Sequence, residues 1–298
     1  FNGQDVGIGY SPSIKIANSN IIFVTKPIGR GHVIFNGRDL GETHLNDGVK
    51  SGPLTENEVY LDENGNFAYL KNVNGKEHVI YNGKDMGEGV SRSVQISKNN
   101  IAFARVVNPK ILDSSRRHII YNGKDIGPGD NPMMAGDNFA YWTFDRVLNQ
   151  YGFYDEKSKI IFNGKDLGAG EKETIQLLKD SIVFIRRESG NKKIVLNGKV
   201  IGDFDEYGRW PEVFEDHIVY ERKIDDKVHI FMDGKDLGEG KAHTFAYSEG
   251  NYAYERQVGE NSRIIYNGRD VGEGENPVLS GNNFAAAKLF PLEIGSAV

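Results

Sequence analysis

Residues 78–89 read HVIYNGKDMGEG, and nearly the same dozen returns as HIIYNGKDIGPG at 118–129 and as KIIFNGKDLGAG at 159–170. The common phrase is Asn-Gly-x-x-x-Gly. Its Asn stands at positions 2, 36, 82, 122, 163, 197 and 267, and Asp233 takes the same slot in one further copy. The eight copies lie 34 to 46 residues apart. A fixed phrase at such intervals is the mark of a repeat architecture.

Each copy predicts a β-hairpin. A strand rich in β-branched and aromatic residues leads into Asn-Gly, which favours a two-residue type I′ turn with positive φ at both central residues. A second phrase alternates with the first, as in ISKNNIAFA at 96–104 and MAGDNFAYW at 134–142. Its polar centre is typical of a turn, and the residues that follow have high β propensity. Two hairpins per repeat give a unit of four strands, A to D.

Eight such units predict an all-β fold, an eight-bladed β-propeller of four-stranded antiparallel blades that takes up residues 1–298 as a single domain. A seven-bladed ring is the alternative. Phe1–Gly7 is the end of a C–D hairpin and 275–288 is an A–B hairpin, so the N-terminal strand is expected to pair with the C-terminal blade and close the ring. The start in mid-phrase suggests that upstream residues are missing. The tail at 289–298 fits neither phrase.

The second phrase resembles the WD40-like (PD40) repeat of TolB-type and peptidase-associated propellers. The residues that match its Pro-x-x-Ser-x-(Asp/Asn)-(Gly/Asn)-x-hydrophobic-Ala-(Phe/Tyr) form are Pro277, Ser280, Asn282, Phe284 and Ala285 in one blade, and Pro132, Asp137, Phe139, Ala140 and Tyr141 in another. The resemblance implies a propeller that binds proteins or peptides, or that gates an attached hydrolase. The Asn-Gly-Lys-Asp-x-Gly hairpin departs from the family pattern, so no family activity is carried over.

Composition narrows the classes of partner. The formal net charge is −6, which does not suggest binding to nucleic acid or to an anionic membrane. There is no cysteine, and no run of 18 apolar residues that could span a membrane as a helix. The expectation is a soluble monomer without a cofactor. The compartment is open, with a periplasmic or secreted location favoured over the cytoplasm.

Loop length predicts which face carries function. The A–B and C–D turns are short and uniform, whereas the B–C and D–A connections vary. Residues 43–58, 106–117 and 144–158 are the longest connections, on the second to fourth blades. Long loops on a rigid scaffold tend to carry function. Drift in unselected loops is the alternative explanation.

Aromatic and arginine side chains on these connections are the candidate ligand contacts, because such side chains bury much area with few rotatable bonds. They are Trp142, Phe144, Arg146, Tyr151, Tyr154, Arg105, Arg116, Arg117, Tyr207 and Trp210. The alternative is that the rings pack on their own blades.

Cations recur where strand B ends. The aligned residues are Thr25, Lys71, Arg105, Thr143, Arg186, Arg222, Arg256 and Lys288. Such a broken ring of charge could bind an anionic ligand. Pairing with the recurrent Glu42, Glu88, Glu239 and Glu273 at the end of strand D would equally explain it.

No catalytic or metal-binding motif is found. Four histidines share one slot in strand C of different blades, namely His32, His78, His118 and His229. That slot indicates a repeated structural role. The aspartates that follow the Asn-Gly turns are expected to accept backbone hydrogen bonds. The calcium-loop-like DENGN at 62–66 lacks the required Gly and Glu, and predicts a plain A–B turn.

The leading hypothesis is a non-enzymatic propeller that recognises a protein or peptide on the face of the long B–C and D–A loops. A carbohydrate- or anion-binding propeller is the second hypothesis. A hydrolase or lyase with its site in the central funnel is the third, because propeller enzymes often lack a local motif.

Overall fold

In the computed structural model, the described residues are 1–3, 5–9, 13–25, 29–45, 59–107, 117–148, 154–204, 211–215 and 217–287. The chain forms two compact units, Phe1–Ile182 and Val183–Val298. The single domain expected for residues 1–298 remains a prediction.

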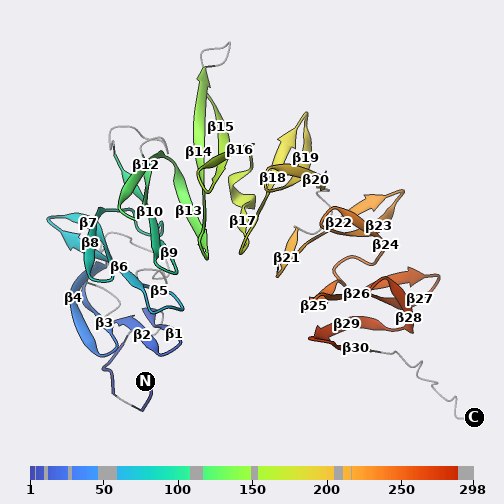
Figure 1. Cartoon of the computed structure of the whole chain (residues 1–298), viewed down its shortest axis with the longest axis horizontal. Coiled ribbons are helices and arrows are strands. Elements are labelled where there is room, and N and C mark those ends of the chain that lie inside the picture. Colours follow the sequence, from blue (N-terminus) through green and yellow to red (C-terminus); the bar gives the residue numbers. More distant parts are fainter. Residues whose placement is uncertain are drawn as a thin grey trace, which may run out of the picture. The chain divides into compact units, whose positions relative to one another are not determined.

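The described chain is all-β, and its eight sheets are the blades of a β-propeller, as the repeat predicts (Figure 1). Seven sheets have four antiparallel strands in chain order. The strands of the first four blades are β1 (Lys15–Ala17), β2 (Asn20–Val24), β3 (Gly29–Phe35) and β4 (Arg38–Leu45); β5 (Val59–Leu61), β6 (Phe67–Val73), β7 (Lys76–Tyr81) and β8 (Lys84–Glu88); β9 (Gln95–Ser97), β10 (Asn100–Val106), β11 (Arg117–Tyr121) and β12 (Lys124–Pro128); β13 (Asp130–Ala135), β14 (Asn138–Leu148), β15 (Tyr154–Phe162) and β16 (Lys165–Ala169).

The last four blades follow a short 3₁₀ helix, η3 (Lys172–Thr174). Their strands are β17 (Gln176–Leu177), β18 (Ile182–Glu188), β19 (Asn191–Leu196) and β20 (Lys199–Asp203); β21 (Glu212–Phe214), β22 (His217–Ile224), β23 (Lys227–Met232) and β24 (Lys235–Glu239); β25 (Ala246–Ser248), β26 (Asn251–Val258), β27 (Asn261–Tyr266) and β28 (Arg269–Glu273); β29 (Glu275–Ser280) and β30 (Asn283–Ala287).

The Asn-Gly turns have the predicted type I′ geometry. Asn82 has φ 50° and Gly83 has φ 81°, and all eight copies show positive φ at both central residues. Positive φ at two successive positions is tolerated by Asn followed by Gly and by few other pairs. The recurrence of the phrase therefore follows from its backbone geometry.

The turn asparagine also holds strand B, a role that the sequence analysis missed. Asn122 Oδ1 accepts the N–H of Ile101 at 2.9 Å, and Asn122 Nδ2 donates to Asn100 Oδ1 at 2.8 Å. The same two-bond bracket holds four other turns, at Asn36, Asn82, Asn163 and Asn267. The bracket explains why strand B so often begins with Asn. In the sixth blade Asp233 replaces the turn asparagine, and His217 replaces the strand asparagine and lies 2.6 Å from the carboxylate.

Alternating side chains of strand B pack against different blades, as predicted. Ile101 and Phe103 are fully buried in a cluster with side chains of the second blade, including Leu70. The small Ala102 and Ala104 face the other way, where Tyr141 of the fourth blade packs against them.

A glycine after strand D makes room for the aromatic residue of the next strand B. A Cβ on Gly89 would lie 2.4 Å from Val79 and 2.9 Å from Phe103, and one on Gly240 would lie 2.5 Å from Ile230 and 3.0 Å from Tyr254. Real Cβ atoms do not approach other heavy atoms so closely. Gly9 and Gly129 occupy equivalent places against Phe23 and Tyr141. Packing between blades therefore requires the last glycine of the repeated sequence HVIYNGKDMGEG, which is Gly89.

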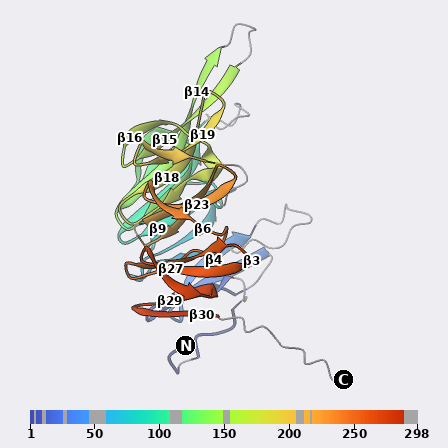
Figure 2. The ribbon, with the colours of Figure 1, turned by 90° about the vertical axis from the view of Figure 1, so that its right-hand side faces the viewer.

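One expectation about the fold is not detected, and another is wrong. Within the described residues, Phe1–Gly7 belongs to no strand and β29–β30 form a sheet of two strands, so the predicted ring-closing pairing is not found. The connection at 144–158 is also largely strand, because β14 and β15 stay paired from Ala140↔Phe162 to Leu148↔Tyr154. The ribbon extends past the rest of its blade in two views (Figures 1 and 2).

Candidate functional site

A polar network recurs on the outer strands of most blades. The aspartate after the Asn-Gly turn accepts the backbone N–H of the glycine two residues later, as at Asp85 and Gly87, where the distance is 2.8 Å. This bond confirms the role predicted for the recurrent aspartates. The second carboxylate oxygen lies near the side chain seven residues earlier, in strand C. That side chain is histidine in four blades, and His78 Nδ1 lies 2.9 Å from Asp85 Oδ2.

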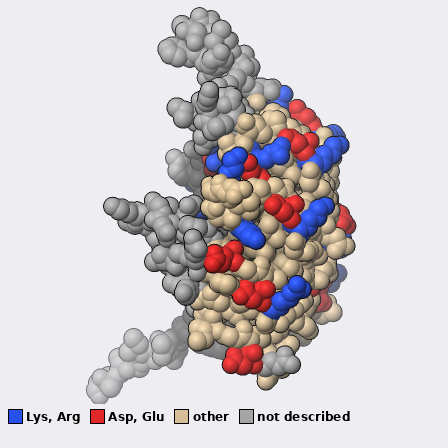
Figure 3. All heavy atoms as spheres, turned by 90° about the vertical axis from the view of Figure 1, so that its left-hand side faces the viewer, with Lys and Arg blue, Asp and Glu red and all other residues tan. Residues whose placement is uncertain are grey.

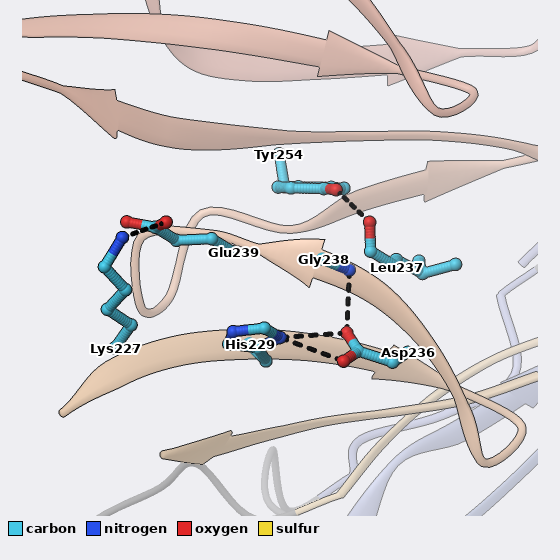
Figure 4. A network of polar contacts seen from close by, with 7 residues as sticks. All are labelled: Lys227, His229, Asp236, Leu237, Gly238, Glu239 and Tyr254. Atoms are coloured by element: carbon cyan, nitrogen blue, oxygen red, sulfur yellow. Dashed lines mark hydrogen bonds and ion pairs between the residues drawn. The ribbon is translucent and has the colours of Figure 1, made fainter. Parts of the chain in front are cut away.

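Figure 4 shows the sixth-blade version of this network. His229 Nδ1 lies 2.9 Å from Asp236 Oδ2, and the N–H of Gly238 donates to Asp236 Oδ1 at 2.7 Å. In the same view, the hydroxyl of Tyr254 in the seventh blade donates to the carbonyl oxygen of Leu237 at 2.7 Å. The network thus lies beside a seam between two blades.

The network lowers the pKa of its aspartates. Burial acts to raise the pKa of Asp85 and Asp125, but the glycine N–H and the histidine outweigh it, so each pKa lies below its ordinary value. For Asp39 the N–H of Gly41 is the main cause of the lowering, and His32 adds to it. These carboxylates are therefore ionised over the whole neutral range.

The cations at the end of strand B are largely paired with aspartate. Arg105 Nη2 lies 2.7 Å from Asp125 Oδ2, and Arg256 Nη2 lies 2.9 Å from Asp270 Oδ2. The strand-D glutamates are not the closest partners of these two arginines, although Arg105 helps to lower the pKa of Glu88 and Arg256 that of Glu239. Glu88 instead pairs with Lys76 and Glu239 with Lys227, at the start of strand C. Figure 3 shows acidic and basic side chains side by side over one face.

One depression brings charged groups of two blades together. It has a volume of about 470 Å³ and is lined by His78, Gly87, Glu88, Arg105, Val106 and Val107. The first three belong to the second blade and the last three to the third. Arg105 and His78 come from the repeated network, whereas Val106 and Val107 mark the point where β10 leaves its blade.

The polar side chains around the depression differ in how many of their hydrogen-bonding atoms already have a protein partner. A guanidinium has five N–H donors, and Asp125 engages Nη2 of Arg105, whose side chain is 37% exposed. His78 Nδ1 faces Asp85, and within the described residues no protein group bonds its Nε2. Glu88 is bound by Lys76 at 2.5 Å, and this bond is the main cause of its lowered pKa. Donors on Arg105 and one nitrogen of His78 are thus left for a ligand.

Of the residues chosen from the sequence whose side chains the structure describes, Arg105 alone lines the depression. Trp142 is 7% exposed, meets Phe144 edge-to-face at 4.2 Å and carries Lys172 above its ring at 5.2 Å. Arg117 is paired with Asp130 at 2.5 Å.

The other candidates are placed less fully or not at all. Arg146 and Tyr154 are placed by backbone register only, on the β14–β15 ribbon. Arg116, Tyr151, Tyr207 and Trp210 lie outside the described residues.

His78 was not among the candidates chosen from the sequence, because four histidines occupy the same repeat position in strand C. The slot gives His78 its partner Asp85, but only the neighbouring blade gives it Arg105. The signal that could have found it is the conjunction of a strand-C histidine with a long B–C connection on the next blade, at 106–117.

The described residues show neither a candidate metal-binding cluster nor a candidate membrane-spanning helix. They contain no cluster of three or more His, Cys, Asp or Glu side chains placed to hold a metal ion. No helix among them has the length and apolarity needed to cross a bilayer.

No family model and no curated protein matches the chain. Among solved structures, it is similar to a prolyl endopeptidase, with 11% identity, a TM-score of 0.36, and coverage of 86% of this chain and 48% of that one. It is also similar to the acylaminoacyl peptidase of Pyrococcus horikoshii, with 10% identity, a TM-score of 0.35, and coverage of 87% and 51%. The chain spans about half the length of each structure.

These similarities correct the leading functional hypothesis. The solved structures that resemble the chain are peptidases, and the expectation of a non-enzymatic propeller that recognises a protein or peptide is withdrawn. At such TM-scores neither structure assigns an activity to this chain.

Proposed function

We propose that the depression between the second and third blades binds a small ligand carrying a carboxylate or phosphate group, with Arg105 as its principal cationic contact. The single observation behind this proposal is that an exposed guanidinium and a histidine from different blades meet in one hollow. Guanidinium groups bind carboxylate and phosphate through two parallel hydrogen bonds. Val106 and Val107 add an apolar wall for the rest of the ligand.

The test compares two arginines at the same blade position. Arg105 and Arg256 both end strand B and both pair with an aspartate, but Arg256 is not among the residues of the depression. Binding of inorganic phosphate, acetate and glucuronate is measured by calorimetry for the wild type, Arg105→Gln and Arg256→Gln. We expect Arg105→Gln to weaken binding about tenfold or more, the size of a lost charged hydrogen bond, and Arg256→Gln to leave it within about twofold. Equal loss in both variants, or no binding of any probe by the wild type, would overturn the proposal.

A hydrolytic role is a second candidate. An imidazole whose Nδ1 is fixed by a carboxylate can take up a proton at Nε2 and act as a general base. Of the five histidines whose Nδ1 faces a carboxylate, only His78 is among the residues of the depression. His78→Gln should abolish turnover of an anionic ester, while His229→Gln, which removes the same pair in the sixth blade, should not. Loss of turnover in both variants would contradict a role specific to His78.

The blades are proposed to be divergent WD40-like repeats of the TolB type, on the residue matches at Pro277, Ser280 and Ala285. A monomeric state is part of the same proposal, and light scattering tests it. Phe144, Arg146 and Tyr154 on the β14–β15 ribbon are proposed as additional ligand contacts. Arg146→Ala should weaken phosphate binding less than Arg105→Gln does, and an unchanged affinity would remove Arg146 from the site.

A further inference from the structure

Of the three Asn-Gly pairs in the second blade, at Asn64, Asn74 and Asn82, only the last two have positive φ at both residues, and these two differ in their hydrogen bonding. Asn74–Gly75 joins β6 to β7, and Asn82–Gly83 joins β7 to β8. Both turns have positive φ at both residues, at 54° and 84° in the first and 50° and 81° in the second. The local backbone is thus closely matched, so any difference in their chemistry comes from what holds the side chains.

The Asn82 side chain is bracketed from both ends. Its Oδ1 accepts the N–H of Phe67 at 2.9 Å, and its Nδ2 donates to Asn66 Oδ1 at 2.9 Å. For the exposed Asn74 side chain, no hydrogen bond to any described residue is found. The amide nitrogen of Gly75 donates to Asn72 Oδ1 at 2.9 Å, and Asn72 is itself exposed.

We propose that Asn74–Gly75 is a site of spontaneous deamidation, and that the bracketed Asn-Gly turns are protected from the same reaction. The amide nitrogen of Gly75 attacks Cγ of Asn74, the Cγ–Nδ2 bond breaks, and Nδ2 leaves as ammonia. Water then opens the five-membered succinimide at either carbonyl and gives aspartate or isoaspartate. No oxidant or reductant takes part, because the reaction exchanges an amide for a carboxylate.

The bracket blocks this reaction by fixing the atom that must move. Cγ of Asn82 can reach the nitrogen of Gly83 only after both of its hydrogen bonds to strand B have broken. At Asn74 a single exposed hydrogen bond, from Gly75 to Asn72, has to open. Because deamidation of Asn74 requires one exposed hydrogen bond to break and that of Asn82 requires two, Asn74 should react about tenfold faster or more.

The sixth blade shows what a carboxylate in the bracketed slot requires. Asp233 keeps the bond from the N–H of Ile218 at 2.9 Å, but its second oxygen faces His217 in place of an asparagine. The five bracketed asparagines have a strand asparagine at that place. Conversion of a bracketed asparagine would therefore disturb its partner, whereas conversion of Asn74 disturbs no described side-chain bond.

The new charge at Asn74 would lie two residues from Lys76, whose partner Glu88 lines the depression. A carboxylate at Asn74 competes with Glu88 for Lys76 and adds negative charge near Arg105. This consequence rests on the proposed anion binding, whereas the modification itself does not.

Peptide mapping of the intact protein tests the modification. The protein is held at mildly alkaline pH, native or in urea, and each Asn-Gly peptide is followed by mass spectrometry with chromatographic separation of isoaspartate. We expect Asn74 to convert about tenfold faster than Asn82 in the native protein, and at a similar rate in urea. Equal native rates for Asn74 and Asn82 would overturn the proposal, as would no native conversion of Asn74.

Two variants test the cause of the difference. Asn72→Ala frees the nitrogen of Gly75 and should speed conversion of Asn74. Asn100→Ala opens half of the bracket on Asn122 and should speed conversion there, with Asn82 in the same digest as an unchanged control. No acceleration in either variant would contradict protection by hydrogen bonding. Asn74→Asp should weaken phosphate binding several-fold. If mapping succeeds and phosphate binds equally well to Asn74→Asp, the effect on binding is wrong while the modification stands.

Discussion

The third and seventh blades carry the same polar network with one exchanged residue. In both, the strand-B arginine pairs with Oδ2 of one aspartate, Asp125 or Asp270, and a strand-C side chain contacts the same carboxylate. The strand-C residue is His118 in the third blade and Arg263 in the seventh. Main-chain bonding is unchanged, because a glycine N–H holds the other oxygen in each.

The comparison separates what the repeat requires from what a single blade adds. The aspartate and its glycine form the same bond in both hairpins, and either a histidine or an arginine of strand C can contact the carboxylate. Arg105 becomes a candidate ligand contact only because His78 and Glu88 of the second blade lie beside it. A site in a repeat protein can thus arise where neighbouring copies meet, with every participating residue at an ordinary repeat position.

Removal of the aromatic side chain that each blade inserts into its neighbour should give the largest effect. Phe103 in the third blade is fully buried, and Tyr254 holds the same position in the seventh. Phe103→Ala should destabilise the protein by about 3–5 kcal/mol through lost burial and the cavity left behind. Chemical denaturation measures this, and Tyr254→Ala should give a loss of similar size. A cost below about 1 kcal/mol for either would contradict tight packing at that seam.

Substitution of the glycines that face these aromatic residues should give the next largest loss of stability. Gly89→Ala and Gly240→Ala each place a Cβ less than 2.6 Å from a neighbouring branched side chain. Overpacking of this kind costs about 1–3 kcal/mol, and both variants should lose stability in that range. Gly123→Ala is unsuitable as a control because of its positive φ. Ala102→Gly, which adds no bulk, shows the combined cost of backbone freedom and of one lost buried methyl group.

The hydroxyl of Tyr254 distinguishes the contact between the sixth and seventh blades from the contact that Phe103 makes between the second and third. This hydroxyl bonds the carbonyl oxygen of Leu237 at 2.7 Å, whereas Phe103 has no such group. Tyr254→Phe should cost about 1 kcal/mol, the net value of one hydrogen bond. Burial also raises the pKa of Tyr254 to about 12, so its contribution is complete below pH 10 and is lost as the pH rises toward 12. An ultraviolet titration in which every tyrosine ionises near pH 10 would contradict this burial.

The smallest expected effect is on the stability of the protein at acidic pH. The pKa of Asp125 is lowered in the folded protein, so its stabilising effect is present above its unfolded pKa of about 3.9 and disappears as the pH falls through the folded value. Asp125→Asn should lower stability at neutral pH by about 1 kcal/mol or less and flatten the acid limb of the stability curve. For Asp270 the bond from Arg263 is the main cause of the lowered pKa, and Asp270→Asn should act in the same direction. An unchanged acid limb in both variants would show that the network does not contribute to stability.

The repeat predicted the blades because its signals are local. Asn-Gly sets a turn, and alternation of Ile101 and Phe103 with alanines sets two faces, whatever the neighbours are. Contacts between distant parts of the chain were harder to foresee, since Phe103, which faces Gly89, lies in the next repeat and the bracket on Asn122 joins residues 22 apart in the sequence. The site was missed for the same reason: His78 and Arg105 are ordinary within their own repeats.

The glycine after strand D also defines a natural unit of exchange. Four described seams pair the last residue of one repeat with an aromatic residue of the next strand B, at Gly9, Gly89, Gly129 and Gly240. Excision of residues 90–129 would join Gly89 to the fourth blade, whose Tyr141 would then take the place of Phe103. Removal of one whole repeat between two such glycines would therefore leave a glycine opposite an aromatic residue at the new seam.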